Sequence, residues 1–332
     1  MVSKLRGMSN LKKMMLMVLT LLCAAVISAC ASARPLVITE FALDTVVTVS
    51  LYEGGTPETL QESIALCRRY DDLFSRIKSD SDIGRINSAG GQPVQVSDDT
   101  LELLSIALGY CEASDGALDI TIGAASSLWD FKSETPVLPD RAALEAAVKT
   151  VDYKQVKLDG NTVTLQNPDA RLDLGAVAKG FIADKMAEQL RGAGVTSAII
   201  NLGGNVYVLG NKQGKPFQIG IRAPFAEESK ELGIVEGEDL SAVTSGVYER
   251  CFEKGGRLYH HILDTGTGYP ADSDLSAVTI LSAGSVDGDA MSTICLALGR
   301  EDAEAFLEKQ EARAVLVDRD NQIYTVGDVQ LK

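Results

Sequence analysis

Strand-like and helix-like segments alternate along this 332-residue chain without forming a regular βαβ repeat. Residues 36–52 are rich in Val, Thr and Ile and predict one or two strands, whereas residues 57–77 have the apolar spacing of a helix. Further helices are expected over residues 98–113, 141–151, 178–190, 289–298 and 302–309, and further strands over residues 197–201, 217–221, 241–244, 258–263, 277–281, 314–317 and 322–326. Because a parallel sheet needs a crossover between successive strands, this order predicts an α+β fold with mixed or antiparallel sheets, flanked by helices in a single compact unit.

The first 30 residues have the pattern of a targeting signal. Four basic side chains precede an apolar run over residues 14–27, which is shorter than the roughly 20 residues of a spanning helix. Small residues before Cys30 resemble a bacterial lipobox, after which Cys30 would carry lipid; a simple signal peptide cleaved nearby is the alternative. We therefore expect a signal peptide over residues 1–30, a tether over residues 31–35, a domain over residues 36–332, and an extracytoplasmic, membrane-anchored lipoprotein.

The charge of the chain excludes some partners. Its formal net charge is −15, and loss of the four basic residues before Cys30 takes it to −19. Nucleic acid and anionic lipid recognition depend on clustered Lys and Arg, so we expect no nucleic acid partner and a membrane link through the lipid alone. Four other cysteines, Cys67, Cys111, Cys251 and Cys295, lack metal-binding spacing; we expect mostly reduced core thiols, with one disulfide possible.

Two segments predict sites for phosphate and a metal ion. Residues 172–180 turn through glycine into a helix, where backbone N–H groups and Lys179 could receive an anion; an ordinary helix start explains the same pattern. Asp289 and Thr293 stand four residues apart on a predicted helix, so one face offers a carboxylate and a hydroxyl to Mg²⁺. The alternative is helix capping by Asp287 with a solvated Asp289.

Other residues complete this pattern. Asp119 lies in a strand-like apolar run and needs a partner, because an unpaired buried charge is costly. Residues 201–205 form a glycine turn that is weak evidence by itself. The two histidines of the chain are adjacent, and strand alternation would send His260 and His261 to opposite faces. Together the segments predict a phosphate-bearing ligand, one divalent cation and one histidine base.

Six motifs in this order resemble the FAD:protein FMN transferases, the ApbE-type flavin transferases. They are DGALDITIG, LDLGAVAKG, NLGG, AVTSGVYER, YHHILDTGTGYP and DGDAMSTICLALG, and the resemblance extends from about residue 41 to the C-terminus. It implies an ApbE-like fold and Mg²⁺-dependent transfer of the FMN part of FAD to a threonine hydroxyl of a target protein, with release of AMP. Members are commonly extracytoplasmic lipoproteins, in agreement with Cys30. The implied acceptor belongs to extracytoplasmic electron-transfer systems.

The resemblance also implies a role for each matching residue. His261 corresponds to the catalytic base, and His260 would be structural or exposed. The implied Mg²⁺ ligands are Asp289, Thr293 and the carbonyl near Ala176; the implied FAD contacts are Leu43, Ile77, Ala117, Leu118, Asp119, Asp173, Lys179 and Ile262.

Three positions depart from the family pattern. Ile77 replaces a frequent aromatic residue, Thr265 replaces a proline and should loosen its turn, and Leu43 replaces methionine. Two other functions remain open on the sequence alone: FAD hydrolysis to FMN and AMP by the same residues, and flavin binding by a non-catalytic lipoprotein.

Overall fold

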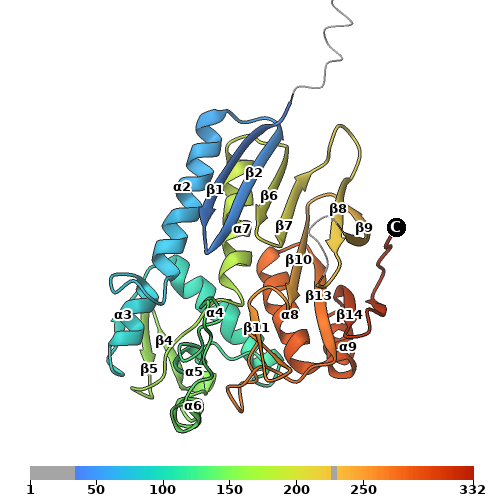
Figure 1. Ribbon diagram of the computed structural model, residues 1–332. Coiled ribbons are helices and arrows are strands. Elements are labelled where there is room, and N and C mark those ends of the chain that lie inside the picture. The colour runs from blue at the N-terminus through green and yellow to red at the C-terminus, as the bar shows by residue number, and fades with distance from the viewer. Residues whose placement is uncertain (1–33, 226–229) are drawn as a thin grey trace, which may run out of the picture. The chain divides into compact units, whose positions relative to one another are not determined.

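A computed structural model describes residues 34–225 and 230–332, and its largest element is an eight-stranded sheet (Figure 1). Every pair of neighbouring strands in this sheet is antiparallel. In spatial order its strands are β1 (Leu36–Ala42), β2 (Thr45–Glu53), β6 (Ser197–Leu202), β7 (Asn205–Gly210), β10 (Leu240–Gly246), β13 (Leu275–Ser282), β14 (Arg313–Asp318) and β15 (Ile323–Val326). The α+β prediction is confirmed, with antiparallel pairing throughout this sheet.

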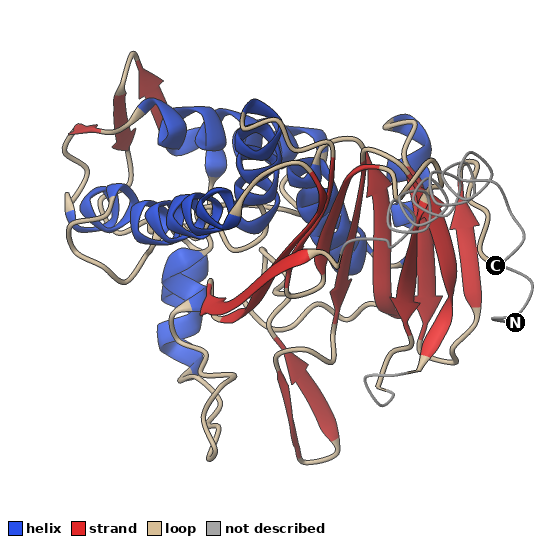
Figure 2. Ribbon diagram, turned by 90° about the horizontal axis from the view of Figure 1, so that it is seen from above, coloured by secondary structure: helices blue, strands red, loops and turns tan. Residues whose placement is uncertain are grey.

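Helices cover one face of the sheet. Alternate residues of β2, Val47, Val49 and Leu51, are buried against them, as the two-residue period of a strand requires. The covering helices are α2 (Pro57–Phe74), α7 (Ala178–Gly192), α8 (Ser285–Leu298) and α9 (Arg300–Lys309). Figure 2 shows most of the helices gathered on one side of the strands. This layer contains the largest apolar core of the described residues.

The opposite face, here called the outer face, is covered only in part. A hairpin of β8 (Phe217–Arg222) and β9 (Glu231–Gly237) packs its apolar side chains on Val208 and Ala242. Near β1 and β2 the outer face is open, so Phe41 and Val46 remain 73% and 56% exposed. The sheet therefore has one closed face and one half-open face.

Smaller elements complete the fold below this sheet. They are α3 (Asp82–Ser88), β3 (Val94–Gln95), α4 (Asp98–Ala113), α5 (Gly123–Ser126), α6 (Arg141–Val148), a 3-10 turn (Tyr153–Gln155), β4 (Val156–Asp159), β5 (Thr162–Leu165), β11 (Cys251–Lys254) and β12 (Arg257–His260). Side-chain caps define several helix starts: Thr56 caps α2, Ser97 caps α4 and Asp140 caps α6.

Some predicted boundaries were wrong. The third predicted helix ends at Val148 rather than residue 151, and the strand predicted over residues 258–263 ends at His260. The helix predicted from Asp289 begins at Ser285, before its apolar run. Strands β7, β9 and β11 and helix α3 were missed, because short or glycine-bounded segments carry little periodicity.

Residues Leu36–Lys332 form one compact unit. The predicted signal peptide, Cys30 and most of the predicted tether lie outside the described residues. None of the described helices is long and apolar enough to cross a membrane. Cys67, Cys111, Cys251 and Cys295 are free thiols in this structure, and all but Cys251 are buried.

The closest helix contact of the core generates a prediction. A methyl group at Gly180 would lie 2.4 Å from the carbonyl oxygen of Ser285 and 2.5 Å from the Cα of Val286, and this backbone cannot rotate away. Gly180→Ala should therefore lower the free energy of unfolding by about 1–3 kcal/mol in urea titrations followed by circular dichroism. Gly192→Ala is the control, because it adds a methyl with no neighbour within 4 Å in the same helix and should stabilise by about 0.5–1 kcal/mol. Equal effects of the two substitutions would contradict this packing.

Candidate active site

A cleft of about 1150 Å³ opens where the β1–β2 turn, the end of α2, the start of α7 and helix α8 meet the outer face of the sheet. It brings together every residue that the sequence analysis selected for catalysis, cofactor or metal. These are Leu43, Ile77, Ala117, Leu118, Asp119, Asp173, Ala176, Lys179, His261, Ile262, Asp289 and Thr293. Residues from six separate segments of the chain thus share one cavity.

Asp289 and Thr293 lie on α8, facing the start of α7. The Asp289 side chain is 3% exposed; its Oδ2 accepts a hydrogen bond from the Gly180 N–H at 2.9 Å, and its Oδ1 lies 3.7 Å from the Lys179 ammonium. The Thr293 hydroxyl donates to the Asp289 carbonyl at 3.2 Å. The spacing predicted for one helix face is confirmed, and Asp289 is not solvated.

Capping by Asp287, the alternative interpretation, is wrong. Gly284 precedes the helix, and the carboxylate of Asp184 on α7 accepts hydrogen bonds from the Ser285 and Val286 N–H groups at 2.7 and 2.9 Å. Asp287 lies inside the first turn and accepts a hydrogen bond from the Tyr110 hydroxyl at 2.7 Å. The N-terminus of α8 is therefore capped by a residue of α7, and Asp289 lines the cleft instead of capping the helix.

The ligand set fits Mg²⁺. Within the described ranges, no three His, Cys, Asp or Glu side chains group as a metal site. Asp289, Thr293 and Ala176 instead line the cleft together, so that a buried carboxylate, a hydroxyl and a backbone carbonyl would be the oxygen ligands. Mg²⁺ prefers such oxygen ligands and completes its shell with water and phosphate oxygens, whereas structural zinc sites use four protein ligands.

The predicted backbone cradle at residues 172–180 is mostly filled by the protein itself. The N–H of Gly175 donates to Asp173, those of Val177 and Ala178 donate to the Leu174 carbonyl, and that of Gly180 donates to Asp289. The ordinary helix start therefore explains much of this pattern. The cation of this segment is the Lys179 ammonium, which is 28% exposed in the cleft.

Asp119 has partners, as predicted, but it does not lie in a strand. It accepts hydrogen bonds from the N–H and hydroxyl of Thr121 at 2.8 and 2.6 Å and from the Tyr153 N–H at 2.8 Å. Burial raises the pKa of Asp119 and these bonds oppose the rise. Nearby, Asp173 accepts from the Ser126 hydroxyl at 2.7 Å and lies 3.5 Å from the Arg76 guanidinium. Both carboxylates are held rigidly at the cleft wall.

His261 lines the cleft whereas His260 does not. Strand β12 ends at His260, so the change of direction at the strand end, rather than strand alternation, separates the two rings. Burial, with the positive charges of Arg250 and Lys179, lowers the pKa of His261 to about 3. Its ring is therefore neutral at pH 7, and its buried Nδ1 has no hydrogen-bond partner among residues 34–225 and 230–332. His260 is 5% exposed, which agrees with a structural role.

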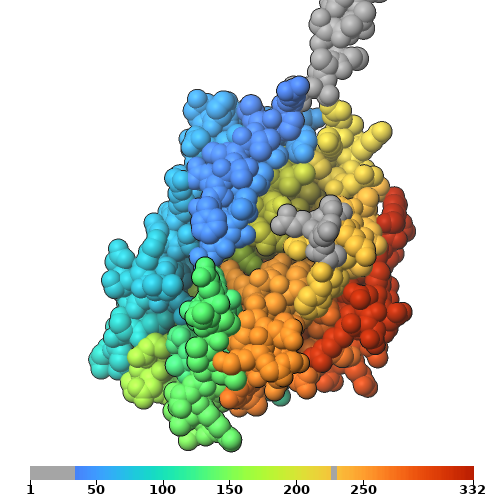
Figure 3. All heavy atoms as spheres, viewed as in Figure 1, coloured from blue at the N-terminus to red at the C-terminus, as the bar shows by residue number. Residues whose placement is uncertain are grey.

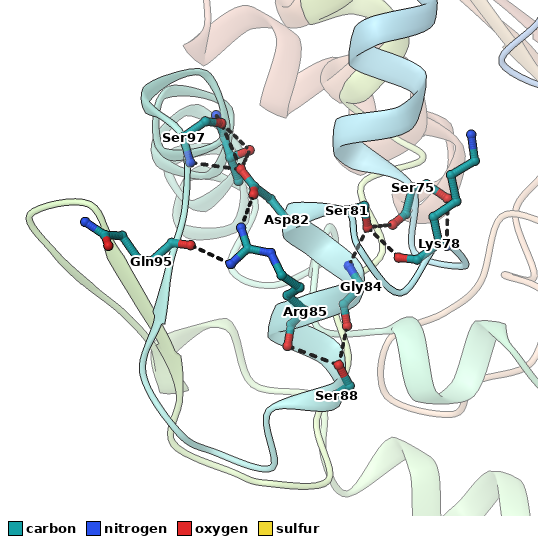
Figure 4. Close-up of polar contacts among 10 residues, drawn as sticks. Ser75, Lys78, Ser81, Asp82, Gly84, Arg85, Ser88, Gln95 and Ser97 are labelled. Atoms are coloured by element: carbon teal, nitrogen blue, oxygen red, sulfur yellow. Dashed lines mark hydrogen bonds and ion pairs between the residues drawn. The ribbon is translucent and has the colours of Figure 1, made fainter.

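The loop that carries Ile77 is fixed from below by a polar network (Figure 4). The Ser81 hydroxyl donates to the Lys78 carbonyl at 2.8 Å and accepts from the Gly84 N–H at 2.8 Å. Next to it, Asp82 accepts from the Thr100 hydroxyl and the Ser97 N–H and pairs with Arg85. Ile77 itself is 84% exposed at the cleft mouth, so its apolar surface is open to a ligand.

Several cleft residues were not selected from the sequence. Arg76, Arg222 and Arg250 add positive charge to the cleft of an acidic chain, and Tyr248 and Glu249 lie beside them. Four of these five come from strand β8 or the AVTSGVYER motif, which was noticed but given no role. Its concentration of Tyr, Glu and Arg after a glycine was the available signal.

One ion pair joins two walls of the cleft. The Lys132 ammonium lies 2.7 Å from the Asp44 carboxylate, and the hydrogen bond from Lys132 lowers the pKa of Asp44 despite partial burial. Figure 3 shows green residues of the Lys132 loop against the blue β1–β2 hairpin. Elsewhere at the rim, the Thr265 hydroxyl donates to the Gly116 carbonyl at 2.8 Å. This bond tethers the turn that loss of proline was expected to loosen.

Comparison with known proteins assigns the family. The ApbE family profile matches residues 43–317. A Klebsiella pneumoniae protein named FAD:protein FMN transferase is 38% identical over 271 residues, 80% of this chain and 84% of that protein; a Treponema pallidum protein of the same name is 38% identical over 267 residues, 75% and 74%. The Thermotoga maritima ApbE protein superposes with a TM-score of 0.81 at 29% identity, covering 88% of this chain and 97% of that one. The chain therefore belongs to the ApbE family, and its predicted fold is confirmed.

The network under the Ile77 loop generates a prediction. Burial would raise the pKa of Asp82, but hydrogen bonds from Thr100 and Ser97 and the pairing with Arg85 outweigh burial and lower it. The ionised Asp82 therefore stabilises the fold at every pH above its pKa in the unfolded chain, about 4. This stabilisation is lost as the pH falls through the lower pKa that Asp82 has in the folded protein. Asp82→Ala should reduce the free energy of unfolding by about 2–4 kcal/mol at pH 7, with a smaller difference near pH 3.

Exposed Asp80, two residues away, provides the control. Asp80→Ala should change the free energy of unfolding by less than about 0.5 kcal/mol in the same urea titrations. A loss for Asp82→Ala no larger than that for Asp80→Ala would show that the network does not stabilise the fold.

Proposed function

We propose that this protein transfers the FMN part of FAD to a threonine hydroxyl of an acceptor protein in an Mg²⁺-dependent reaction that releases AMP. The observation that carries the proposal is the meeting of a neutral His261, the Asp289–Thr293 pair and the Lys179 ammonium in one cleft. Relatives in Klebsiella pneumoniae and Treponema pallidum bear the name FAD:protein FMN transferase and support the same reaction.

In the proposed complex, one wall of the cleft holds the nucleotide. The rigid carboxylate of Asp119, with the backbone of Ala117 and Leu118, would contact the adenosine part, and Asp173 would lie next to it. Leu43, Ile77 and Ile262 offer apolar surface to the flavin side. Ile77 cannot stack as an aromatic ring does, which would weaken FAD binding by about 0.5–1.5 kcal/mol.

The residues around α8 would hold the pyrophosphate in place. Asp289, Thr293 and the backbone of Ala176 would bind Mg²⁺, which supplies neutralisation of negative charge on the phosphate oxygens when bound. Lys179, 3.7 Å from Asp289, would contact another phosphate oxygen as a point charge. The N–H of Gly180 keeps the Asp289 carboxylate oriented toward the cleft.

His261 would receive the proton of the acceptor hydroxyl. The threonine oxygen forms a bond to the FMN phosphorus, the pyrophosphate P–O bond breaks, and AMP leaves with the electron pair of that bond. In a neutral ring one of the two nitrogens carries no proton, so His261 can accept the proton of the hydroxyl without first losing one. Water in place of threonine would give FAD hydrolysis by the same residues.

A labelling experiment tests this function. The purified protein is mixed with FAD, Mg²⁺ and the extracytoplasmic proteins of the same cell, and denatured gels are inspected for covalent flavin fluorescence. Mass spectrometry should find FMN on a threonine of the labelled protein, with one AMP released for each FMN attached. Free FMN without a labelled protein would indicate a hydrolase, and FAD binding without AMP would indicate a non-catalytic binder.

Substitution of the proposed base should separate chemistry from binding. His261→Ala is expected to bind FAD and to lose transfer by about 10²- to 10⁴-fold, measured as AMP release with acceptor. His260→Ala is the matched control; it lies outside the cleft, and its loss should appear in stability rather than in rate. A normal transfer rate in His261→Ala would exclude this histidine as the base.

The proposed metal ligand gives an independent prediction. Asp289→Asn keeps the shape of the side chain and an acceptor for the Gly180 N–H but removes the charge that a divalent cation needs. The variant should require at least about tenfold more Mg²⁺ for half-maximal transfer, and the wild-type protein should lose transfer in EDTA. Full activity of the wild-type protein in EDTA would exclude a metal-dependent reaction.

The proposal extends to the location of the enzyme. A lipid on Cys30 would hold the domain on the extracytoplasmic side of a membrane, where its acceptor would also reside. Cys30→Ser should abolish incorporation of labelled palmitate and move the protein from the membrane fraction to the wash, while transfer in detergent extracts persists. Palmitate labelling of the Cys30→Ser variant would contradict lipid attachment at this residue.

A further inference from the structure

One part of the cleft is lined by residues that are not predicted to bind FAD or the metal ion. That part lies over the outer face of the sheet and is lined by Thr48, Asn201, Val206, Ala242 and Thr244 from β2, β6, β7 and β10. This part, here called the outer groove, belongs to the same cleft of about 1150 Å³ as the part that contains His261.

Strand β8 forms the wall of the outer groove. Ile219, Gly220, Ile221 and Arg222 all line the cleft, and β8 pairs on its other side with β9 (yellow hairpin, Figure 1). Phe217, at the start of β8, lies with its ring centroid 5.4 Å from that of Tyr52 on β2. The unpaired edge of β8 therefore faces the part of the outer face that belongs to β2.

The backbone of Gly220 points into the outer groove. Its partner in register is Ile234, and Ile234 exchanges both of its backbone hydrogen bonds with Lys332, at 2.9 and 3.0 Å. In an antiparallel pair, residues opposite each other either bond to each other or both point away. Gly220 therefore turns its N–H and C=O away from β9, and no hydrogen bond from the described residues reaches them. By strand alternation, Gln218 and Arg222 point the same way.

The side of the outer groove opposite β8 is open and apolar. Phe41 and Val46 are cross-strand partners, 73% and 56% exposed, at the end of the hairpin whose turn lines the cleft. At the other end, Phe225 is 61% exposed with its ring centroid 5.5 Å from that of Tyr248, a cleft residue. A chain lying in the outer groove would find apolar contacts at both ends and unpaired backbone groups along β8.

We propose that the acceptor segment carrying the target threonine binds as an extended strand along the free edge of β8, inside the outer groove. This inference rests on the proposed transfer to a protein. An edge strand recognises its partner through main-chain hydrogen bonds, which a helix cannot supply because its own backbone groups are paired. The outer groove is continuous with the part of the cleft that contains His261, so an extended segment can bring its threonine hydroxyl to the base. FAD would bind to the other wall of the cleft at the same time.

Such recognition has a chemical consequence. The affinity comes from backbone groups that every residue possesses, and specificity comes from the side chains that alternately face the floor of the groove. The accessible floor includes small polar residues such as Thr48 and Thr244, which suits short side chains next to the threonine. The partner is therefore an exposed, extended and small-residue segment of a protein.

The test removes the outward N–H of β8 and leaves the rest of the cleft intact. Gly220→Pro deletes this donor and places a ring on the edge, which an edge strand tolerates where the N–H faces away from its partner. Gly220→Ala is the matched control, because it adds the same Cβ, whose closest neighbour is the movable end of Glu231, and keeps the N–H. Gln218→Pro and Gln218→Ala form a second pair on the same edge in case Gly220→Pro does not fold.

The probe is the acceptor protein identified by the labelling experiment, used with the full FAD-loaded enzyme. We expect Gly220→Pro to raise the KM for the acceptor by about tenfold or more, with the Kd for FAD and the slow release of AMP without acceptor unchanged. Gly220→Ala should raise the KM far less. In the wild-type protein, hydrogen exchange at the Gly220 amide should slow when acceptor binds.

The outcomes separate this inference from the function on which it rests. A KM for the acceptor in both proline variants equal to that of the alanine controls would overturn it, as would unchanged exchange at the Gly220 amide. Loss of FAD binding in Gly220→Pro would also overturn it, because Gly220 would then belong to the FAD wall. Failure of the wild-type protein to label any acceptor would instead refute the proposed function.

Discussion

The contact between helices α7 and α8 is the interaction on which the cleft depends. Gly180 allows the backbones to approach so closely that its N–H reaches the carboxylate of Asp289, and Asp184 from α7 caps the first turn of α8 in return. These reciprocal bonds fix the rotation of α8 about its axis, because Asp289 must face α7. Thr293, one turn later, then faces the cleft with Asp289. A larger residue at position 180 would separate the two helices and displace the oxygens of Asp289 and Thr293 from their positions beside the start of α7.

The cleft of this acidic chain contains charges of both signs. Lys179 and three arginines line the same cavity as the carboxylates of Asp119, Asp173 and Asp289. The cations can therefore contact phosphate oxygens locally, although the cleft as a whole is not positively charged. Burial, with the charges of Arg250 and Lys179, lowers the pKa of His261 and keeps its ring neutral in the free protein. A bound phosphate would offset these two charges and so raise the basicity of the ring.

The sequence predicted the site better than it predicted the elements around it. Asp289 and Thr293 could be assigned to one helix face because a four-residue spacing has a single geometric meaning on a helix. The position of His261 was predicted for the wrong reason, since β12 ends one residue earlier and the turn after it directs the ring. The backbone cradle was overestimated because residues 175–180 satisfy their own N–H groups, which only three-dimensional coordinates reveal. Strand β9 shows the same limit: the pairing of its Ile234 with the C-terminal Lys332 joins positions about a hundred residues apart.

The ion pair between Lys132 and Asp44 closes one side of the cleft mouth with little energy. Both side chains are more than half exposed, and such surface pairs contribute about 0–1 kcal/mol, close to thermal energy at room temperature. The two walls that it joins belong to separate parts of the fold, a hairpin turn and a loop after α5. Separation of the two side chains would therefore cost little free energy, and this side of the cleft mouth could widen without any rearrangement of the core.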